Sequence, residues 1–164
     1  MAIRKKAAAS AAGGSRCSCT ALRKATRRIS QLYDAALAPS GLKITQRAIL
    51  AQIGRTEPTN VGMLAEALVM DAGALAHTLR PLERDGFVSI DVNPDDRRHR
   101  SISLTSEGRA KLIETDALWS RAQAGFDAAV GRVESAALRK ALEALLTEEF
   151  SAAFERSLAQ SAGD

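Results

Sequence analysis

Residues 64–109, LAEALVMDAGALAHTLRPLERDGFVSIDVNPDDRRHRSISLTSEGR, decide the fold. A helix that begins at the N-cap Asn60 reaches this stretch, with Val61, Leu64, Ala65 and Leu68 on one face. Asp71 is a good N-cap for a second helix, whose inward stripe is Leu75, Leu79 and Leu82 and which Asp85-Gly86 ends. Only three residues separate the two helices, which is the spacing of a helix-turn-helix.

After Gly86 the apolar period changes from that of a helix to that of a strand. Val88, Ile90 and Val92 alternate with polar residues, and residues 101–104 alternate again. Between them, Asn93-Pro94-Asp95-Asp96 indicates a turn. The loop at residues 95–100 holds three arginines and one histidine. The sequence therefore predicts a β-hairpin with a basic tip directly after the helix pair.

The flanking segments are predicted to be helical. A first helix starts at Cys17 and ends at Pro39 and Gly41, and Thr45 is the expected N-cap of a short second helix. Thr105 is the expected N-cap of a long helix, and a break within residues 131–135 leads to one last helix. The fold class is mainly α with a small β-hairpin wing, a winged helix-turn-helix domain plus a further helical region.

Composition limits the class of protein. A chain of 164 residues with 46% hydrophobic and 26% charged residues suits one soluble globular domain, and no apolar run is long enough for a membrane span. The net charge is +4, but residues 1–30 carry eight basic residues and no acid. Such a basic arm either binds a polyanion or is a solvated, disordered tail. The sequence has no signal-peptide pattern, and Cys17 and Cys19 are too close together for an ordinary structural disulfide. Both observations indicate a reducing compartment, the cytoplasm.

The helix pair and hairpin together favour a DNA reader whose partner is double-stranded DNA. The N-terminal part of the second helix of a helix-turn-helix meets base edges in the major groove, and an arginine-bearing hairpin enters the minor groove. Residues 43–111 hold ten basic and nine acidic residues, so the DNA-facing side must segregate its charges. The candidate base contacts are Ala72, Gly73, Ala74, Ala76, His77 and Arg80, the wing contacts are Arg97, Arg98, His99 and Arg100, and the phosphate contacts are Thr45, Arg47, Asn60 and Arg84.

The quoted stretch resembles the winged helix-turn-helix of the MarR regulators. The matching pieces are Leu64-Ala65, Asp71, Leu75, Leu79, the run from Pro81 to Gly86, Asp96, Arg98, Leu104-Thr105 and Gly108. The resemblance covers roughly residues 20–150 and implies a homodimer that reads a pseudo-palindromic operator. It implies that Arg98 enters the minor groove while Asp96 steadies the wing. One departure is Ala72-Gly73-Ala74, which supplies no side-chain donor where the family commonly has Arg and then Ser or Thr.

The resemblance also implies the division of the chain. Residues 1–16 are expected to form a disordered basic N-terminal arm, and residues 17–40 a dimerisation helix. The winged helix-turn-helix DNA-binding domain is expected at 43–105, and the C-terminal dimerisation helices at 106–156. The apolar stripes of these helices agree with a dimer, because they are too many for a monomer of this size to bury alone.

Members of this family usually respond to a signal, and two kinds fit the sequence. One is a small aromatic or amphipathic acid, with an expected lining of Arg23, Arg27, Leu32, Tyr33, Leu37, Ala48, Leu112 and Trp119, although aromatic residues at helical spacing also suit a plain core. The other is oxidation of Cys17 or Cys19, whose thiol pKa a helix N-terminus and nearby basic residues would lower. The alternatives for the two cysteines are dimer packing and no particular role.

The sequence contains none of the signatures of an enzyme or a cofactor site. It has no glycine-rich phosphate loop, no metal-ligand cluster and no assembled Ser–His–Asp set, and a zinc site at Cys17 and Cys19 lacks two further ligands. We therefore expect no cofactor, no metal and no catalysis. The expected function is a DNA-binding transcriptional repressor released by a small ligand, with a thiol-based redox regulator and a protein-binding adaptor as alternatives.

Overall fold

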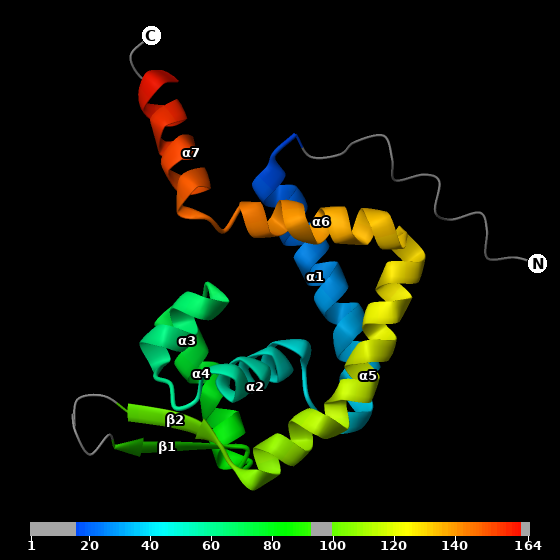
Figure 1. Cartoon of the computed structure of the whole chain (residues 1–164), viewed down its shortest axis with the longest axis vertical. Helices are drawn as coiled ribbons and strands as arrows, with labels where there is room; N and C mark the ends of the chain where they lie inside the picture. Colours follow the sequence, from blue (N-terminus) through cyan, green and yellow to red (C-terminus); the bar gives the residue numbers. More distant parts are fainter. Residues whose placement is uncertain (1–15, 93–99, 162–164) are drawn as a thin grey trace, which may run out of the picture. The chain divides into compact units, whose positions relative to one another are not determined.

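The computed structural model describes residues 16–92 and 100–161, and the chain divides into two compact units, residues 1–119 and 120–164. Of the predicted disordered arm, residues 1–16, only Arg16 is among the described residues. The predicted wing contacts Asp96, Arg97, Arg98 and His99 also lie outside them. The elements of Figure 1 are α1 (Ser18–Leu37), the 3-10 helix η1 (Ala38–Ser40), α2 (Ile44–Thr56), α3 (Val61–Leu68), α4 (Ala72–Arg84), β1 (Val88–Val92), β2 (Arg100–Leu104), α5 (Ser106–Val130), α6 (Arg132–Ala144) and α7 (Glu148–Ser161).

The first unit is built around one apolar core between α2, α3, α4 and the hairpin (Figure 1). The predicted inward residues of the helix pair, Leu64, Leu75, Leu79 and Leu82, are at most 2% exposed. Burying a leucine contributes roughly 1.5–3 kcal/mol, so this core sets the position of α4. The other core residues are Leu42, Ile49, Leu50, Ile53, Val88, Ile102 and Leu104.

Local capping confirms three predicted helix starts. The Asn60 side chain accepts a hydrogen bond from the Met63 amide at 2.9 Å, which starts α3. The Asp71 carboxylate accepts from the amides of Gly73 and Ala74 at 2.9 and 3.0 Å. The Thr105 hydroxyl accepts from the Gly108 amide at 3.0 Å and starts α5. These side chains satisfy amides that a helix start leaves without partners.

The turn between α3 and α4 contains a left-handed residue that is not glycine. Val69 has φ = 50°, a conformation that β-branched residues rarely adopt. The turn is closed by the amides of Val69 and Met70, which donate to the carbonyls of Glu66 and Ala65 at 3.1 and 2.8 Å. The packing of both helices on the core therefore holds a turn that the local sequence does not favour.

The hairpin is antiparallel, with Val88 opposite Leu104 and Val92 opposite Arg100. A short bridge adds the loop before α3, because Thr59 and Ile102 exchange backbone hydrogen bonds at 3.1 and 2.8 Å. This bridge ties the wing to the loop that joins α2 and α3.

Glycine is required where α5 starts. A Cβ on Gly108 would overlap the carbonyl oxygen of Phe87, which lies at the base of the hairpin. The Thr105 hydroxyl donates to the Gly86 carbonyl at 2.6 Å, and the Thr105 amide donates to Phe87 at 3.2 Å. Helix α5 therefore begins in direct backbone contact with the hairpin.

Two sequence predictions about helix boundaries are wrong. Thr45 is not the N-cap of α2, because Lys43 precedes the helix and its amide donates to the Gln46 side chain at 2.9 Å. The predicted last helix is two helices, since α6 begins directly after Gly131 and α7 starts after Thr147, whose hydroxyl accepts from the Phe150 amide at 3.2 Å. A threonine cap followed by two glutamates starts α7 without any proline or glycine.

In the second unit a polar cluster holds the turn from α5 to α6. The Asp127 carboxylate accepts from Ser135 at 2.5 Å and from Gln123 at 3.0 Å, and it pairs with Arg139 at 3.2 Å. The Ser135 hydrogen bond is the main reason that the pKa of Asp127 is lowered. Gly131, with φ = 101°, makes the bend itself.

Helices α6 and α7 and the turn that joins them expose many apolar side chains. Leu146, Phe154 and Leu158 are each more than half exposed, and Phe150 stacks on Phe154 with ring centroids 6.2 Å apart. The same helices expose Val133, Leu138, Leu142 and Leu145. Within the described residues, no helix is both long enough and apolar enough to span a membrane.

A matched pair of glycine substitutions in α5 tests the contact with the hairpin. We expect Gly108→Ala to lower the free energy of unfolding by roughly 1–3 kcal/mol, because the added methyl group meets a backbone carbonyl. Gly125→Ala places its methyl group in open space and should stabilise the chain by up to about 1 kcal/mol. Urea unfolding measures both, and equal stabilities for the two variants contradict the close approach.

Candidate nucleic-acid interface and adjacent pocket

The first turn of α4 presents a surface of backbone and methyl groups. Ala72, Gly73 and Ala74 are exposed, as are His77 and Arg80 one and two turns on. Ala76 is half-buried. The Asp71 carboxylate already binds the first-turn amides, so the polar side chains that this face offers a partner are those of His77 and Arg80.

Beside α4, the hairpin carries Arg100 as an exposed residue at the start of β2. The remaining predicted wing contacts lie outside the described residues. Val92 pairs with Arg100 at the end of the hairpin away from α5. The described part of the hairpin thus has the two antiparallel strands that the sequence predicts.

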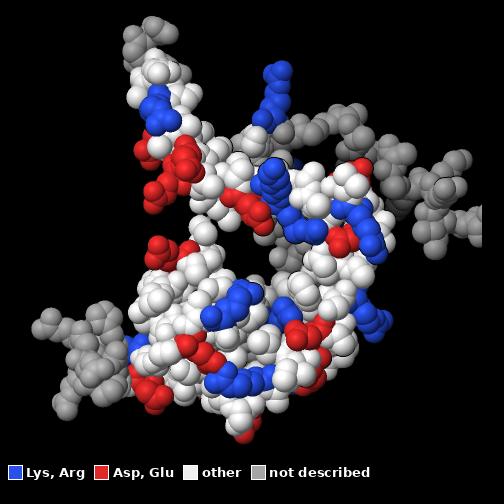
Figure 2. All heavy atoms as spheres, in the orientation of Figure 1, with Lys and Arg blue, Asp and Glu red and all other residues white. Residues whose placement is uncertain are grey.

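The predicted phosphate contacts have different surroundings. Thr45 is exposed on α2, while Asn60 is half-buried and caps α3. Arg84 is exposed, and its Nε donates to Asp85 at 2.9 Å, which raises the pKa of the arginine. In Figure 2, acidic and basic side chains are interspersed over the face in view, and no large patch of one sign appears there.

The expectation that Arg47 lies on a polar face is wrong. Its side chain is 10% exposed and donates to the Asp116 carboxylate on α5 at 2.5 Å. Its guanidinium carbon lies 4.6 Å from the centre of the Trp119 ring. Arg47 therefore faces α5 and is buried there, not exposed on a polar face.

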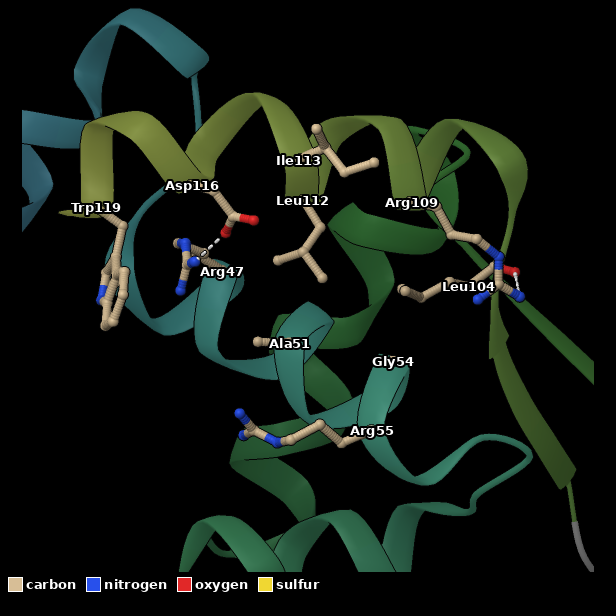
Figure 3. Close-up of a pocket in the computed structure, with 10 residues that line it drawn as sticks. All are labelled: Arg47, Ala51, Gly54, Arg55, Leu104, Arg109, Leu112, Ile113, Asp116 and Trp119. Atoms are coloured by element: carbon tan, nitrogen blue, oxygen red, sulfur yellow. Dashed lines mark hydrogen bonds and ion pairs between the residues drawn. The ribbon is translucent and has the colours of Figure 1, made fainter.

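Between α2, β2 and α5 lies a pocket of about 460 Å³. Figure 3 shows Arg47 and Arg55 reaching it from α2, and Arg109, Leu112, Asp116 and Trp119 from α5. Two of the predicted ligand contacts, Leu112 and Trp119, line this pocket.

The other six predicted ligand contacts do not line it: five of them lie on α1, and Ala48 lies on α2 but outside the lining. Leu37 is fully buried and Leu32 is 51% exposed. Arg23 and Arg27 are exposed on α1, while Tyr33 and Ala48 are half-buried.

Arg55, Arg109 and Asp116 also line the pocket and are not among the residues that the sequence predicts. The signal that was available is the spacing of Asp116 and Trp119, which places both on one face of a helix.

At the wing end of the pocket, Glu57 connects three elements. Its carboxylate accepts a hydrogen bond from the Leu104 amide of β2 at 2.8 Å and pairs with Arg109 of α5. The hydrogen bond from Arg109 is the main cause that lowers the pKa of Glu57. The side chain of Glu57 is only 18% exposed, while that of Arg109 is 54% exposed, so this link between loop, strand and helix is open to water on the arginine side.

Cys17 and Cys19 are exposed at the start of α1. The Thr20 side chain and then its amide hydrogen-bond to the Cys17 sulfur, which lowers the pKa of that thiol, and the Cys19 amide adds to this effect. The predicted direction is confirmed for Cys17, but the cause is the threonine and the helix amides and not the basic residues. Among the described residues, no group of three or more His, Cys, Asp and Glu is placed to hold a metal ion.

Comparison with known proteins gives consistent matches. A family model described as the MarR family matches residues 42–99. Over 84 residues the chain is 31% identical to the HTH-type transcriptional regulator SarZ of Staphylococcus saprophyticus, a match that covers 51% of this chain and 58% of that regulator. The chain thus matches little more than half the length of that relative.

Two solved structures match more of the chain. The M. tuberculosis transcriptional regulator MosR, in complex with DNA, is 37% identical with a TM-score of 0.65, covering 78% of this chain and 97% of that one. The transcriptional repressor CouR, bound to a 23-mer DNA duplex, is 25% identical with a TM-score of 0.76, covering 83% and 96%.

The Glu57 link makes stability depend on pH. A carboxylate whose pKa is lower in the folded chain stabilises the fold fully above its unfolded pKa near 4.5, and this stabilisation is lost as the pH falls through the folded pKa. We expect Glu57→Gln to lower the unfolding free energy by about 1 kcal/mol at neutral pH. The difference from the unmodified chain should shrink in acid. Urea unfolding across the pH range measures it, with Glu83→Gln, an exposed acid on α4, as the control. A difference that does not change with pH contradicts the role of the charge.

Proposed function

The chain belongs to the MarR family, and we propose that it is a DNA-binding transcriptional repressor that acts as a homodimer on a pseudo-palindromic operator. The observation that carries the proposal is the exposed face of α4 beside the hairpin, in a fold shared with two regulators that were solved on DNA. The match covers nearly the whole length of both MosR and CouR. Their binding to DNA therefore supports DNA as the partner of this chain.

In this proposal α4 lies in the major groove and the hairpin reaches the minor groove. The small residues at 72–74 allow the backbone of α4 to come close to the base edges. His77 and Arg80 then supply the hydrogen bonds to bases, and thymine methyl groups and DNA shape supply the remaining selectivity. The basic tip, Arg97, Arg98, His99 and Arg100, supplies the minor-groove charge, with Asp96 steadying it.

Dimerisation is supported by the apolar surface of the second unit. Exposed leucines and phenylalanines on α6 and α7 are more than a soluble monomer usually leaves in contact with water. We propose that residues 17–40 and 106–156 contribute to the interface with a second copy. A two-fold dimer presents two α4 helices to successive half-sites about one helical turn apart.

The proposed signal is a small aromatic or amphipathic acid that releases the dimer from DNA. A second candidate, favoured by the lowered pKa of Cys17, is oxidation of this thiol. A Cys17 thiolate would attack a hydroperoxide, which leaves as an alcohol or water, and the resulting sulfenic acid would condense with a second thiol to a disulfide and water. The second thiol would be Cys19 or a cysteine of the partner copy.

DNA binding is tested by a mobility shift on the DNA upstream of the chain's own coding sequence, with random competitor. We expect Arg80→Ala to weaken binding by roughly 1–3 kcal/mol, and Arg98→Ala to do the same. Arg55→Ala, an exposed arginine on α2 outside the predicted DNA contacts and the proposed interface, is the matched control and should bind unchanged. Affinity should fall steeply with salt, and each bound duplex should carry two chains.

Binding that is absent, or equal for specific and random DNA, would refute the DNA-binding proposal. A protein partner captured through the α4 face would then favour the adaptor. If Arg80→Ala weakens DNA binding and Arg98→Ala does not, only the proposed contact between the wing and the minor groove is rejected.

The redox candidate is tested by the same shift after treatment with peroxide. If Cys17 is the sensor, oxidation releases the DNA, thiol restores binding, and Cys17→Ser is insensitive. Cys19→Ser tests whether Cys19 is the second thiol: if it is, the variant still reacts with peroxide but forms no disulfide, and if Cys17 of the partner copy is, the disulfide still forms. Binding that is unaffected by peroxide assigns the cysteines to packing and leaves the small acid as the signal.

A further inference from the structure

Helix α1 has an apolar side and a basic side. At 3.6 residues per turn, two sets of its residues fall on opposite sides of the helix axis. The apolar set is Leu22, Ala25, Ile29 and Leu32, and the basic set, which we call the α1 basic face, is Arg23, Lys24, Arg27 and Arg28. When the apolar side packs on a second copy, as proposed above, the α1 basic face stays in contact with water.

The α1 basic face has no counter-charge in the described part of the chain. All four side chains are exposed, and no acidic side chain among the described residues pairs with any of them. Arg23 lies four residues before Arg27, and Lys24 lies four residues before Arg28, so each pair places like charges side by side, which is unfavourable. The first acid along α1 is Asp34, whose carboxylate already accepts a backbone amide of α2 at 2.7 Å. Four positive charges are therefore open to an external partner.

These charges lie at the end of α1 that is not anchored to the winged part of the unit. The anchor is at the other end of the helix, where Leu37 is fully buried and Asp34 binds the start of α2. Arg23 comes 11 residues before Asp34, which is about 16 Å along the helix axis. In Figure 1 the N-terminal half of α1 points away from the hairpin of the same unit. The α1 basic face is therefore separate from the DNA-reading face of α4.

The density of charge fits the backbone of DNA. Arg23 and Arg28 are five residues apart, so four positive charges lie within about 7.5 Å of the helix axis. Double-stranded DNA carries one phosphate charge per about 1.7 Å, or about four over the same length. The sequence before α1 continues the excess of positive charge, because it adds Arg4, Lys5, Lys6 and Arg16 and no acid. Lysine and arginine bind phosphates without regard to base sequence.

An anionic membrane is the other polyanionic surface that a basic amphipathic helix can bind. Such binding requires the apolar side of the helix to enter the lipid. In the proposed dimer the apolar side of α1 packs on the second copy, and only the basic side is left for a further partner. A surface that offers charge alone favours DNA phosphates over lipid.

We propose that the α1 basic face is a second DNA-binding surface, which holds the phosphate backbone of another duplex while α4 and the hairpin read the operator. The contact has no sequence preference, because it consists of charges and phosphates. A dimer that carries this surface twice bridges two DNA segments. The inference rests on the proposed function only for the identity of the first duplex.

Capture of a second duplex tests the proposal. Beads that carry a random duplex of about 30 base pairs are loaded with the full chain, washed, and given a fluorescent duplex of another random sequence. We expect the chain to retain the fluorescent duplex at about 50 mM salt and to release it at about 300 mM, because contacts with the DNA backbone depend steeply on salt.

Two sets of substitutions at the same positions separate charge from fold. The first set removes the charge and should lower retention of the second duplex roughly tenfold or more; it combines Arg23→Gln, Lys24→Gln, Arg27→Gln and Arg28→Gln. The second set keeps the charge and should retain the duplex as the unmodified chain does; it combines Arg23→Lys, Arg27→Lys and Arg28→Lys. Circular dichroism and sedimentation check that both variants keep the fold and the mass of the unmodified chain.

The salt dependence of the capture step counts the charges that take part. The logarithm of the affinity falls with the logarithm of the salt concentration by about 0.9 for each phosphate neutralised. Four charges therefore predict a slope of about three to four in magnitude, and Arg27→Gln alone should lower it by about one. The variant without the four charges should keep its sequence preference in the mobility shift on the upstream DNA.

Three results would overturn the proposal: no capture by the unmodified chain, equal capture after the four charges are removed, or loss of capture with the lysine set. Equal capture would mean that the two α4 helices of a dimer hold the two duplexes. Flotation with vesicles of anionic phospholipid in place of DNA capture would assign the face to a membrane and also reject it.

The capture experiment uses random DNA throughout, so its result is distinct from that of the mobility shift. If the chain captures a second duplex through the four charges but has no sequence preference, the α1 surface stands and the repressor falls. If it prefers the upstream DNA but captures no second duplex, the repressor stands and the α1 surface is rejected.

Discussion

The contact between Gly108 and the Phe87 carbonyl is the constraint on which the rest of the first unit depends. It fixes where α5 starts relative to the hairpin, and the Thr105 side chain locks the same junction through Gly86 and Gly108. From that start, the periodicity of the helix brings Arg109 to Glu57 and Asp116 to Arg47. The wing, the pocket and the start of the long helix therefore share one anchor.

Much of the winged unit could be predicted because its signals are local. Asn60 and Asp71 act through amides two or three residues away, and the change of period after Gly86 reflects the two faces of a strand. The core face of α4 follows from three leucines at helical spacing. These features need no knowledge of distant partners, which is why the sequence alone predicts the helix pair and the hairpin.

The environment of Arg47 depends on a partner 69 residues away, and a pattern within one helix does not contain that information. An arginine is usually expected to be exposed to solvent. Only the spacing of Asp116 and Trp119, which places both on one face of α5, indicates a partner for Arg47. The break before α7 escaped prediction for a different reason. Thr147 ends one helix and starts another with a side-chain cap, while the apolar stripe continues on both sides and hides the boundary.

The turn at Val69 determines whether the α3–α4 helix pair can keep its geometry in another protein. A valine with φ = 50° has little tendency to form that turn in an isolated segment, so the angle between α3 and α4 is a property of the whole domain. If α3 and α4 were grafted onto another scaffold, the angle between them would be lost unless α2 and the hairpin were transferred with them. Replacing the valine by glycine or asparagine is the change that would make the element portable.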